Sequence, residues 1–147
     1  LLCHLSQLLR RYAMRSKHLI KSVGIFAAMA LMMSTAAFAA SNLSAWCEVP
    51  AFNGSEYSED SAKKETTGSS AYLYDATVGG GYQVDCRQHC ISNNVNGAWT
   101  RDISTVNNAG YMEGTTRMLK DNVVCLEFSN DLLTSVRVEV NGTWDSN

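Results

Sequence analysis

The chain has 147 residues, a charged fraction of 18% and a formal net charge of −2. All 14 acidic residues but only seven of the 12 basic residues follow residue 39, so residues 40–147 carry a net charge of −7. Such an acidic domain repels phosphate backbones and anionic lipid surfaces. We therefore expect neither nucleic acid nor membrane surfaces among its partners.

Residues 14–39 have the pattern of a secretory signal peptide. Basic residues follow Met14, an apolar run covers 23–33, and Ala37-Phe38-Ala39 matches the A-x-A cleavage pattern. The apolar run has 11 residues, whereas a membrane-spanning helix needs about 20. We expect a helical signal peptide that is cleaved near Ala39-Ala40, and a secreted protein. Residues 1–13 are interpreted as upstream sequence or a misassigned start, outside the fold.

Residues 40–147 are predicted to form one all-β domain. Apolar and polar residues alternate in segments that recur about every 10 to 15 residues, with turn residues between them. The clearest of these segments cover 71–78, 81–91, 122–128 and 136–140. We expect a small antiparallel β-sandwich of about six to eight short strands.

Three further segments of this domain do not show the alternation of apolar and polar residues. The polar stretch 53–70 is interpreted as either a long mobile loop or a polar edge strand. Gly79-Gly80-Gly81 is predicted to turn the chain, because glycine tolerates positive φ angles. The stretch 102–120 gives no clear pattern.

The alternation also predicts which side chains share a face of each strand. In 71–78 one face carries Tyr72, Tyr74, Ala76 and Val78. In 81–91 one face carries Tyr82, Val84, Cys86 and Cys90, and the other carries Gln83, Asp85, Arg87 and His89. In 122–128 either Val124, Leu126 and Phe128 or the residues between them point inward. Near the C-terminus the shared face carries Val136, Val138, Val140 and Trp144.

Aromatic residues give two alternatives. Most of them share the parity of the valines, so we expect the greater part of this set in the core: Tyr72, Tyr74, Tyr82, Trp99 and Trp144. If they are exposed instead, Tyr72, Tyr74 and Trp99 are candidates for a platform that binds carbohydrate or peptide.

Four cysteines follow the predicted cleavage site: Cys47, Cys86, Cys90 and Cys125. An even number of cysteines in an exported domain favours disulfide bonds. On one straight strand the Cα atoms of Cys86 and Cys90 would lie about 13 Å apart, and a disulfide needs less than about 7 Å. We expect Cys86 and Cys90 to pair separately with Cys47 and Cys125, in an order that the sequence leaves open.

Metal sites are weaker alternatives. Cys86, His89 and Cys90 could bind zinc together with a further cysteine, but their spacing differs from the usual C-x-x-C pairs. In a strand, His89 also points away from both cysteines. A calcium site from Glu56, Glu59 and Asp60 lacks the usual loop spacing. We predict no cofactor.

Residues 40–147 contain no recognisable catalytic set. His89 is the only histidine among them, so a serine or cysteine hydrolase would have to use it. We interpret His89 as a solvated residue on the polar face of a strand. No serine lies in a G-x-S-x-G motif, and we expect no enzymatic activity.

The C-terminal third has a recognisable pattern. It contains Val123-Val124-Cys125-Leu126-Glu127-Phe128 and then Val138-Glu139-Val140-Asn141-Gly142-Thr143-Trp144-Asp145. Together with Asn96-Gly97-Ala98-Trp99-Thr100-Arg101, this resembles small secreted proteins of Gram-positive bacteria that end in a V-x-G-x-W motif. Some of these are loosely grouped with lactococcin-type bacteriocins. The resemblance implies export and supplies no catalytic residue.

These features predict a small secreted, disulfide-stabilised module that binds an unknown extracellular or cell-surface ligand. The first alternative function is that of a bacteriocin-like secreted antimicrobial protein. The second is that of a secreted module that depends on zinc or calcium.

Overall fold

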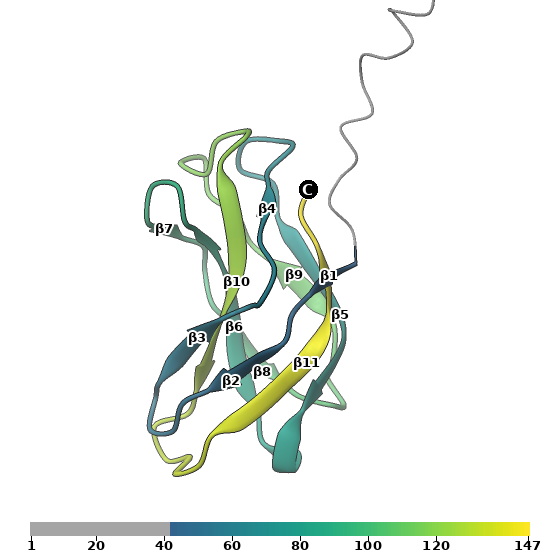
Figure 1. The fold of residues 1–147 in the computed structure, drawn as a ribbon, viewed down its shortest axis with the longest axis vertical. Coiled ribbons are helices and arrows are strands. Elements are labelled where there is room, and N and C mark those ends of the chain that lie inside the picture. The colour runs from purple at the N-terminus through teal and green to yellow at the C-terminus, as the bar shows by residue number, and fades with distance from the viewer. Residues whose placement is uncertain (1–41) are drawn as a thin grey trace, which may run out of the picture. The chain divides into compact units, whose positions relative to one another are not determined.

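The computed structural model describes residues 42–147. The predicted signal peptide, 14–39, and the predicted upstream segment, 1–13, lie outside the described residues. The described part of the chain is all-β, with eleven short strands and one 3-10 turn (Figure 1), which confirms the predicted fold class. Within this part no helix is long and apolar enough to cross a membrane.

The strands form two antiparallel sheets. Sheet A contains β1 (Leu43–Ser44), β2 (Cys47–Val49), β5 (Ala71–Val78), β9 (Gly110–Met112) and β11 (Val138–Asp145). Sheet B contains β3 (Ser55–Tyr57), β4 (Ala62–Lys63), β6 (Val84–Cys90), β7 (Val95–Asn96), β8 (Thr100–Ile103) and β10 (Val123–Asn130). The strand order is β1-β11-β5-β9 in sheet A and β3-β10-β6-β7 in sheet B.

Three edge positions are each shared by two short strands. β1 and β2 both pair with β11, β3 and β4 both pair with β10, and β7 and β8 both pair with β6. The eleven strands therefore fill four positions in each sheet, and the prediction of about six to eight strands is too low because three edge positions are divided between two short strands each. The polar stretch 53–70 supplies β3 and β4, so of the two interpretations of this stretch, the edge strand is confirmed.

Both sheets contribute side chains to one hydrophobic core. In the core cluster, β10 contributes Val124, Leu126 and Phe128, and β11 contributes Val138, Val140 and Trp144, as the alternation predicts. The prediction is wrong for Val136, which precedes β11 and is 43% exposed. Trp144 is fully buried, and its indole N–H donates to the carbonyl oxygen of Ser44 at 3.2 Å. The prediction that most of the larger aromatic residues lie in the core is wrong, because Tyr72, Tyr74, Tyr82 and Trp99 are half-buried or exposed.

β5 departs from the predicted alternation at Asp75. This residue has a φ of +51°, and Asp75 and Ala76 together lie opposite the single residue Gly142 of β11. Such a two-against-one β-bulge reverses the side-chain parity of a strand. Ala71 and Leu73 therefore point inward before the bulge and Ala76 and Val78 after it. The prediction that Tyr72 and Tyr74 share a face with Ala76 and Val78 is wrong for this reason.

Four connections lie at one end of the two sheets, which we call the loop end. They are 50–54, 79–83, 104–109 and 131–137. Val84 at the start of β6 pairs with both Ile103 and Asn130 at the ends of β8 and β10, and the Phe52 N–H donates to the Thr134 carbonyl at 2.8 Å. The glycine turn Gly79–Gly81 lies in this end of the molecule, with positive φ at Gly80 and Gly81, as predicted.

Candidate functional site

Three tyrosines meet on the outer face of sheet A, and we call them the tyrosine cluster. The ring centroids of Tyr72 and Tyr74 are 5.1 Å apart. Tyr111 of β9, the register partner of Tyr72, lies 4.7 Å from the Tyr72 ring at an interplanar angle of 65°. Such edge-to-face contacts hold aromatic rings in fixed orientations. Tyr111 is 65% exposed, so the cluster presents an ordered aromatic surface to solvent.

Polar side chains of β11 border the tyrosine cluster. Asp145 lies opposite Tyr72 and Thr143 lies opposite Tyr74 in the strand register. The Asp145 carboxylate accepts a hydrogen bond from the backbone N–H of Asn42 at 2.8 Å, which fixes its orientation. Carboxylate and hydroxyl oxygens can accept hydrogen bonds from a ligand that rests on the rings. The surface therefore combines stacking area with hydrogen-bonding groups.

Trp99, the third residue of the predicted platform, lies in the connection between β7 and β8 of the other sheet. The Arg87 guanidinium lies 4.1 Å from the centroid of the Trp99 ring, and Arg87 Nε lies 2.7 Å from Glu127 Oε2. Glu127 pairs in turn with Tyr57 of β3. A row of side chains thus crosses the outer face of sheet B, in the order Tyr57, Glu127, Arg87 and Trp99. The structure brings Tyr72 and Tyr74 together but does not place Trp99 with them.

A second row on the same face contains Cys125, His89 and Asn96. These residues are direct register partners on β10, β6 and β7. His89 Nδ1 lies 2.6 Å from Asn96 Oδ1, and the His89 ring is 4.8 Å from the ring of Tyr57. His89 is only 8% exposed. The interpretation of His89 as a solvated residue is therefore wrong, because Asn96 and Tyr57 enclose it.

The order cysteine, histidine, amide is also found in cysteine hydrolases, but the thiol here is not activated. Burial raises the pKa of Cys125 to about 12, and the Glu127 carboxylate and Cys90 add to this effect. Burial also raises the pKa of Tyr57, with Glu127 as the next cause. A thiol that keeps its proton at neutral pH is a poor nucleophile. This row is therefore suited to holding the sheet surface together.

None of the four cysteines is bonded in the structure, so the two expected disulfides are absent from the described residues. The side chains explain this. Cys47, Cys86 and Cys90 lie in the core cluster, whereas Cys125 pairs with His89 on the outer face of sheet B. A bond from Cys125 to any of the other three would have to cross the sheet, and the expectation of two bonds is corrected accordingly.

Cys47 and Cys86 are neighbours in the core, although they belong to different sheets. Burial raises the pKa of the Cys86 thiol well above its ordinary value, and the nearby Cys47 is the next cause. Burial likewise raises the pKa of Cys47 to about 12. These two thiols share the dry space between the sheets.

The zinc alternative is wrong for a similar geometric reason. Cys86 and Cys90 point into the core, while His89 points to the outer face of the same strand. The three side chains therefore cannot meet at one ion. Among residues 42–147 no group of three histidine, cysteine or carboxylate side chains could hold a metal, which also applies to Glu56, Glu59 and Asp60.

Lys64 is a buried amine that the sequence does not indicate. Its side chain is 1% exposed, and Nζ donates to the Ser69 carbonyl at 2.6 Å. When the Gln88 amide is oriented to satisfy both groups, its oxygen accepts from Nζ at 3.1 Å and its nitrogen donates to the Ser69 carbonyl at 3.2 Å. Burial lowers the pKa of Lys64 to about 8. The partners are neutral, so the protonated amine destabilises the fold.

A cavity of about 490 Å³ opens at the loop end between three of the connections. Its walls include Tyr82, Val106, Asp131 and Thr134. A neighbouring cavity of about 380 Å³ shares Tyr82, Asp131 and Thr134 and adds Leu132 and Leu133. Sequence reasoning missed this end of the molecule, because loop residues show no periodic pattern.

No protein-family model matches this chain, and no curated protein matches its sequence. Function therefore has to be inferred from the side chains described above. Of these groups, the tyrosine cluster contains the most exposed tyrosine, Tyr111 at 65%, and it contains two of the three residues that the sequence suggested.

Proposed function

We propose that the protein is a small exported module, a β-sandwich without enzymatic activity, that binds carbohydrate at a cell surface through the tyrosine cluster. One observation carries this proposal. The bulge at Asp75 turns Tyr72 and Tyr74 from the core side to the solvent side of β5, where they meet Tyr111. Without the bulge, the alternation would bury both rings.

The bulge supports a binding role because it has an energetic cost. A non-glycine residue in the left-handed region costs on the order of 1 kcal/mol, and Asp75 is one of seven such residues among those that the structure describes. Turning two tyrosines outward also leaves aromatic area in water that the core could have buried. Both costs are offset if the rings bind a ligand.

The charge of the domain narrows the class of carbohydrate. Residues 40–147 carry a net charge of −7, and Asp145 lies beside the rings. Acidic polysaccharides would be repelled. The apolar face of a neutral or amino sugar can stack on Tyr111, while its hydroxyl or ammonium groups donate to Asp145 and Thr143.

Export and disulfide bonding belong to the same proposal. The signal-peptide pattern at 14–39 supports export. In an oxidising compartment we expect one disulfide, between Cys47 and Cys86, because both are core cysteines, they belong to different sheets, and Cys47 contributes to the raised pKa of Cys86. Cys125 remains a thiol on the outer face of sheet B.

The proposal is tested with purified protein and a panel of insoluble glycans, including peptidoglycan, chitin and cellulose. We expect sedimentation with at least one of them. Tyr111→Ala should weaken that binding by about tenfold or more, the effect of losing a central aromatic contact. Tyr57→Ala is the matched control, because Tyr57 is a 46% exposed tyrosine on the other sheet, and it should bind like the wild type.

Two results would contradict the proposal. One is equal loss of binding in Tyr111→Ala and Tyr57→Ala, which would separate binding from the tyrosine cluster. The other is release of soluble sugar from a glycan of the panel, abolished by a point substitution, since that would make the protein an enzyme.

A further inference from the structure

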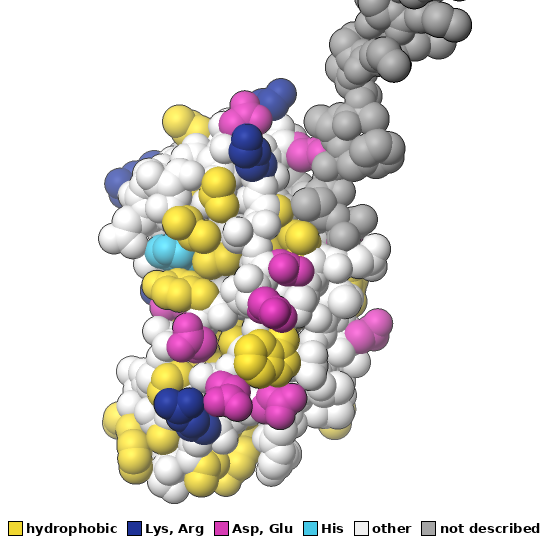
Figure 2. Space-filling model, in the orientation of Figure 1, with side chains coloured by type: hydrophobic (Ala, Val, Ile, Leu, Met, Phe, Trp, Pro, Cys, Tyr) yellow, Lys and Arg dark blue, Asp and Glu magenta, His cyan; other side chains and the backbone are white. Residues whose placement is uncertain are grey.

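Exposed apolar side chains are concentrated at the loop end. Eleven large hydrophobic residues of the described chain are exposed, and six of them lie on its four connections. We call these six the apolar tips: Phe52, Tyr82, Val106, Leu132, Leu133 and Val136. Figure 2 shows hydrophobic side chains gathered at this lower end of the molecule.

The apolar tips protrude from the surface. Val106 is 94% exposed and Leu133 is 93% exposed, and Leu132 and Phe52 are 68% and 64% exposed. Four of them lie around two adjoining cavities, whose walls also contain polar residues. Leu132 and Leu133 line a cavity with Tyr82, and Tyr82 lines the adjoining cavity with Val106. Exposed apolar side chains that cluster in this way mark a site of contact with another molecule or with a membrane.

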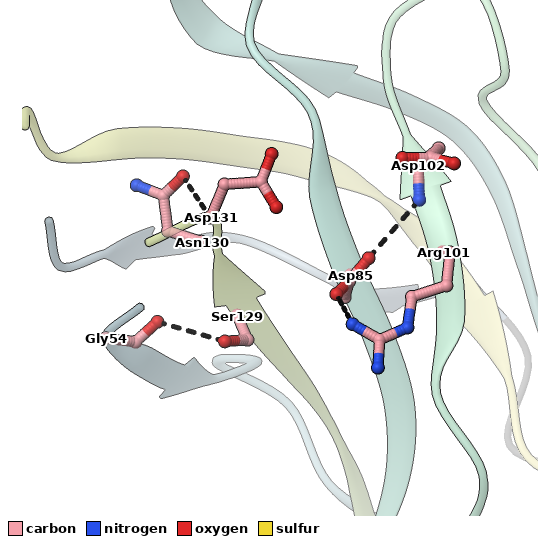
Figure 3. A network of polar contacts seen from close by, with 7 residues as sticks. All are labelled: Gly54, Asp85, Arg101, Asp102, Ser129, Asn130 and Asp131. Atoms are coloured by element: carbon pink, nitrogen blue, oxygen red, sulfur yellow. Dashed lines mark hydrogen bonds and ion pairs between the residues drawn. The ribbon is translucent and has the colours of Figure 1, made fainter. Parts of the chain in front are cut away.

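Buried polar groups hold the apolar tips in place. Asn130 is 2% exposed, and its Nδ2 donates to the carbonyls of Val136 at 3.2 Å and Pro50 at 3.4 Å. Its Oδ1 accepts from the Asp131 N–H at 3.0 Å, and the Ser129 hydroxyl donates to the Gly54 carbonyl at 3.4 Å (Figure 3). The connections that carry Phe52 and Leu133 are therefore ordered before any partner arrives.

We propose that the apolar tips insert into a lipid surface with zwitterionic headgroups. The charges of the four connections identify the kind of lipid. They contain one acidic residue, Asp131, and one basic residue, Arg137, and Arg137 Nη1 is paired with Glu48 Oε2 at 3.2 Å. Recognition of anionic lipids uses clusters of lysine and arginine, which this end lacks.

A second copy of the chain fits this surface less well. A two-fold contact places the same patch against itself, and Asp131 lines both cavities at the centre of this patch. Two Asp131 carboxylates would then meet in an apolar interface, which is unfavourable. Headgroups and water at a membrane surface can solvate the same carboxylate.

The lipid contact is separate from the tyrosine cluster. Tyr72 lies six residues along β5 from Val78, which borders the loop end, a separation of roughly 20 Å along a strand. A molecule that inserts the apolar tips end-on leaves the outer face of sheet A accessible. This proposal departs from the expectation that membrane surfaces are not partners, because the charge argument behind that expectation applies to anionic surfaces.

The test is sedimentation of the purified protein with vesicles of phosphatidylcholine, and with vesicles that also contain phosphatidylglycerol. We expect binding to phosphatidylcholine, with no gain from the anionic lipid. Leu132→Ser/Leu133→Ser should lower the partition coefficient by at least about tenfold, since two leucines lose their transfer from water. Ile91→Ser/Leu119→Ser is the matched control and should bind normally. Ile91 and Leu119, each 52% exposed, lie beyond the other ends of β6 and β10.

Thermal unfolding verifies that both double variants fold. The proposal is overturned if the wild type does not sediment with phosphatidylcholine, if both double variants lose binding equally, or if anionic lipid strengthens binding. It is also overturned if light scattering finds that the wild type and the Ile91→Ser/Leu119→Ser variant are dimers and that the Leu132→Ser/Leu133→Ser variant is a monomer. Glycan binding is unaffected by these substitutions, so failure here is distinguishable from failure of the proposed function.

Discussion

At the scale of single residues, the buried Lys64 links stability to pH. Its pKa falls from 10.5 to about 8 on folding because burial disfavours the charged amine. Between these two values the unfolded chain still binds the proton that the folded protein has released. The free energy of unfolding therefore rises with pH across this window, by up to about 3 kcal/mol for a fully buried amine.

Lys64→Met tests this link. At about pH 7 we expect the variant to exceed the wild type in free energy of unfolding by roughly 1–3 kcal/mol. The Gln88 amide can take over the hydrogen bond to the Ser69 carbonyl, at 3.2 Å. By about pH 10 the difference should have largely disappeared, as the wild-type amine loses its charge. Urea unfolding at both pH values measures it, and a difference that is the same at both would refute the assignment.

The cysteines give a second prediction at this scale. In protein secreted from cells and purified without reductant, we expect one disulfide, Cys47–Cys86, and an intact mass about 2 Da below that of the reduced chain. The Cys86→Ser variant should have the intact mass calculated for its own sequence with every cysteine reduced. A mass about 4 Da below the reduced value would instead mean two disulfides, which the outward position of Cys125 opposes.

At the scale of elements, sequence alternation predicts β6, β10 and β11 well. Val84, Cys86 and Cys90 on β6 and the three apolar residues of β10 are buried because one face of each strand meets the core. It fails in β5, since a bulge depends on the partner strand, and Gly142 lies 67 positions after Asp75. Tyr111 was missed because β9 has three residues, too few for a visible period.

Gly142 makes the bulge possible. A Cβ at this position would lie 3.1 Å from the Ala76 Cα and 3.1 Å from the Tyr74 carbonyl oxygen. We expect Gly142→Ala to lower the free energy of unfolding by about 1–3 kcal/mol, because backbone atoms have to move, and to weaken glycan binding through displacement of Tyr74.

Gly79→Ala is the control for this substitution. Its Cβ would meet the backbone of Glu139 at 3.5 Å, an ordinary contact, so it should cost less than about 1 kcal/mol. Chemical denaturation of both variants compares them. Equal losses of stability would show that the close approach at Gly142 does not support the bulge.

At the scale of the whole molecule, the two proposed binding surfaces lie at different places on a shared core. The tyrosine cluster is on the face of sheet A, and the apolar tips are on loops at one end of both sheets. The core itself follows largely from the alternation of apolar residues in β6, β10 and β11. The positions of the tyrosine cluster and the apolar tips do not follow from this alternation, because each depends on which distant segments the fold places side by side.

The central claim is that the tyrosine cluster is the glycan-binding surface. The most direct test is to titrate isotopically labelled protein with a soluble fragment of the glycan that it sediments with, and to follow backbone amide shifts by NMR. We expect the largest shifts at Tyr72, Tyr74, Tyr111 and Asp145. Shifts confined to the outer face of sheet B, around Arg87 and Trp99, or to the loop end would contradict the account.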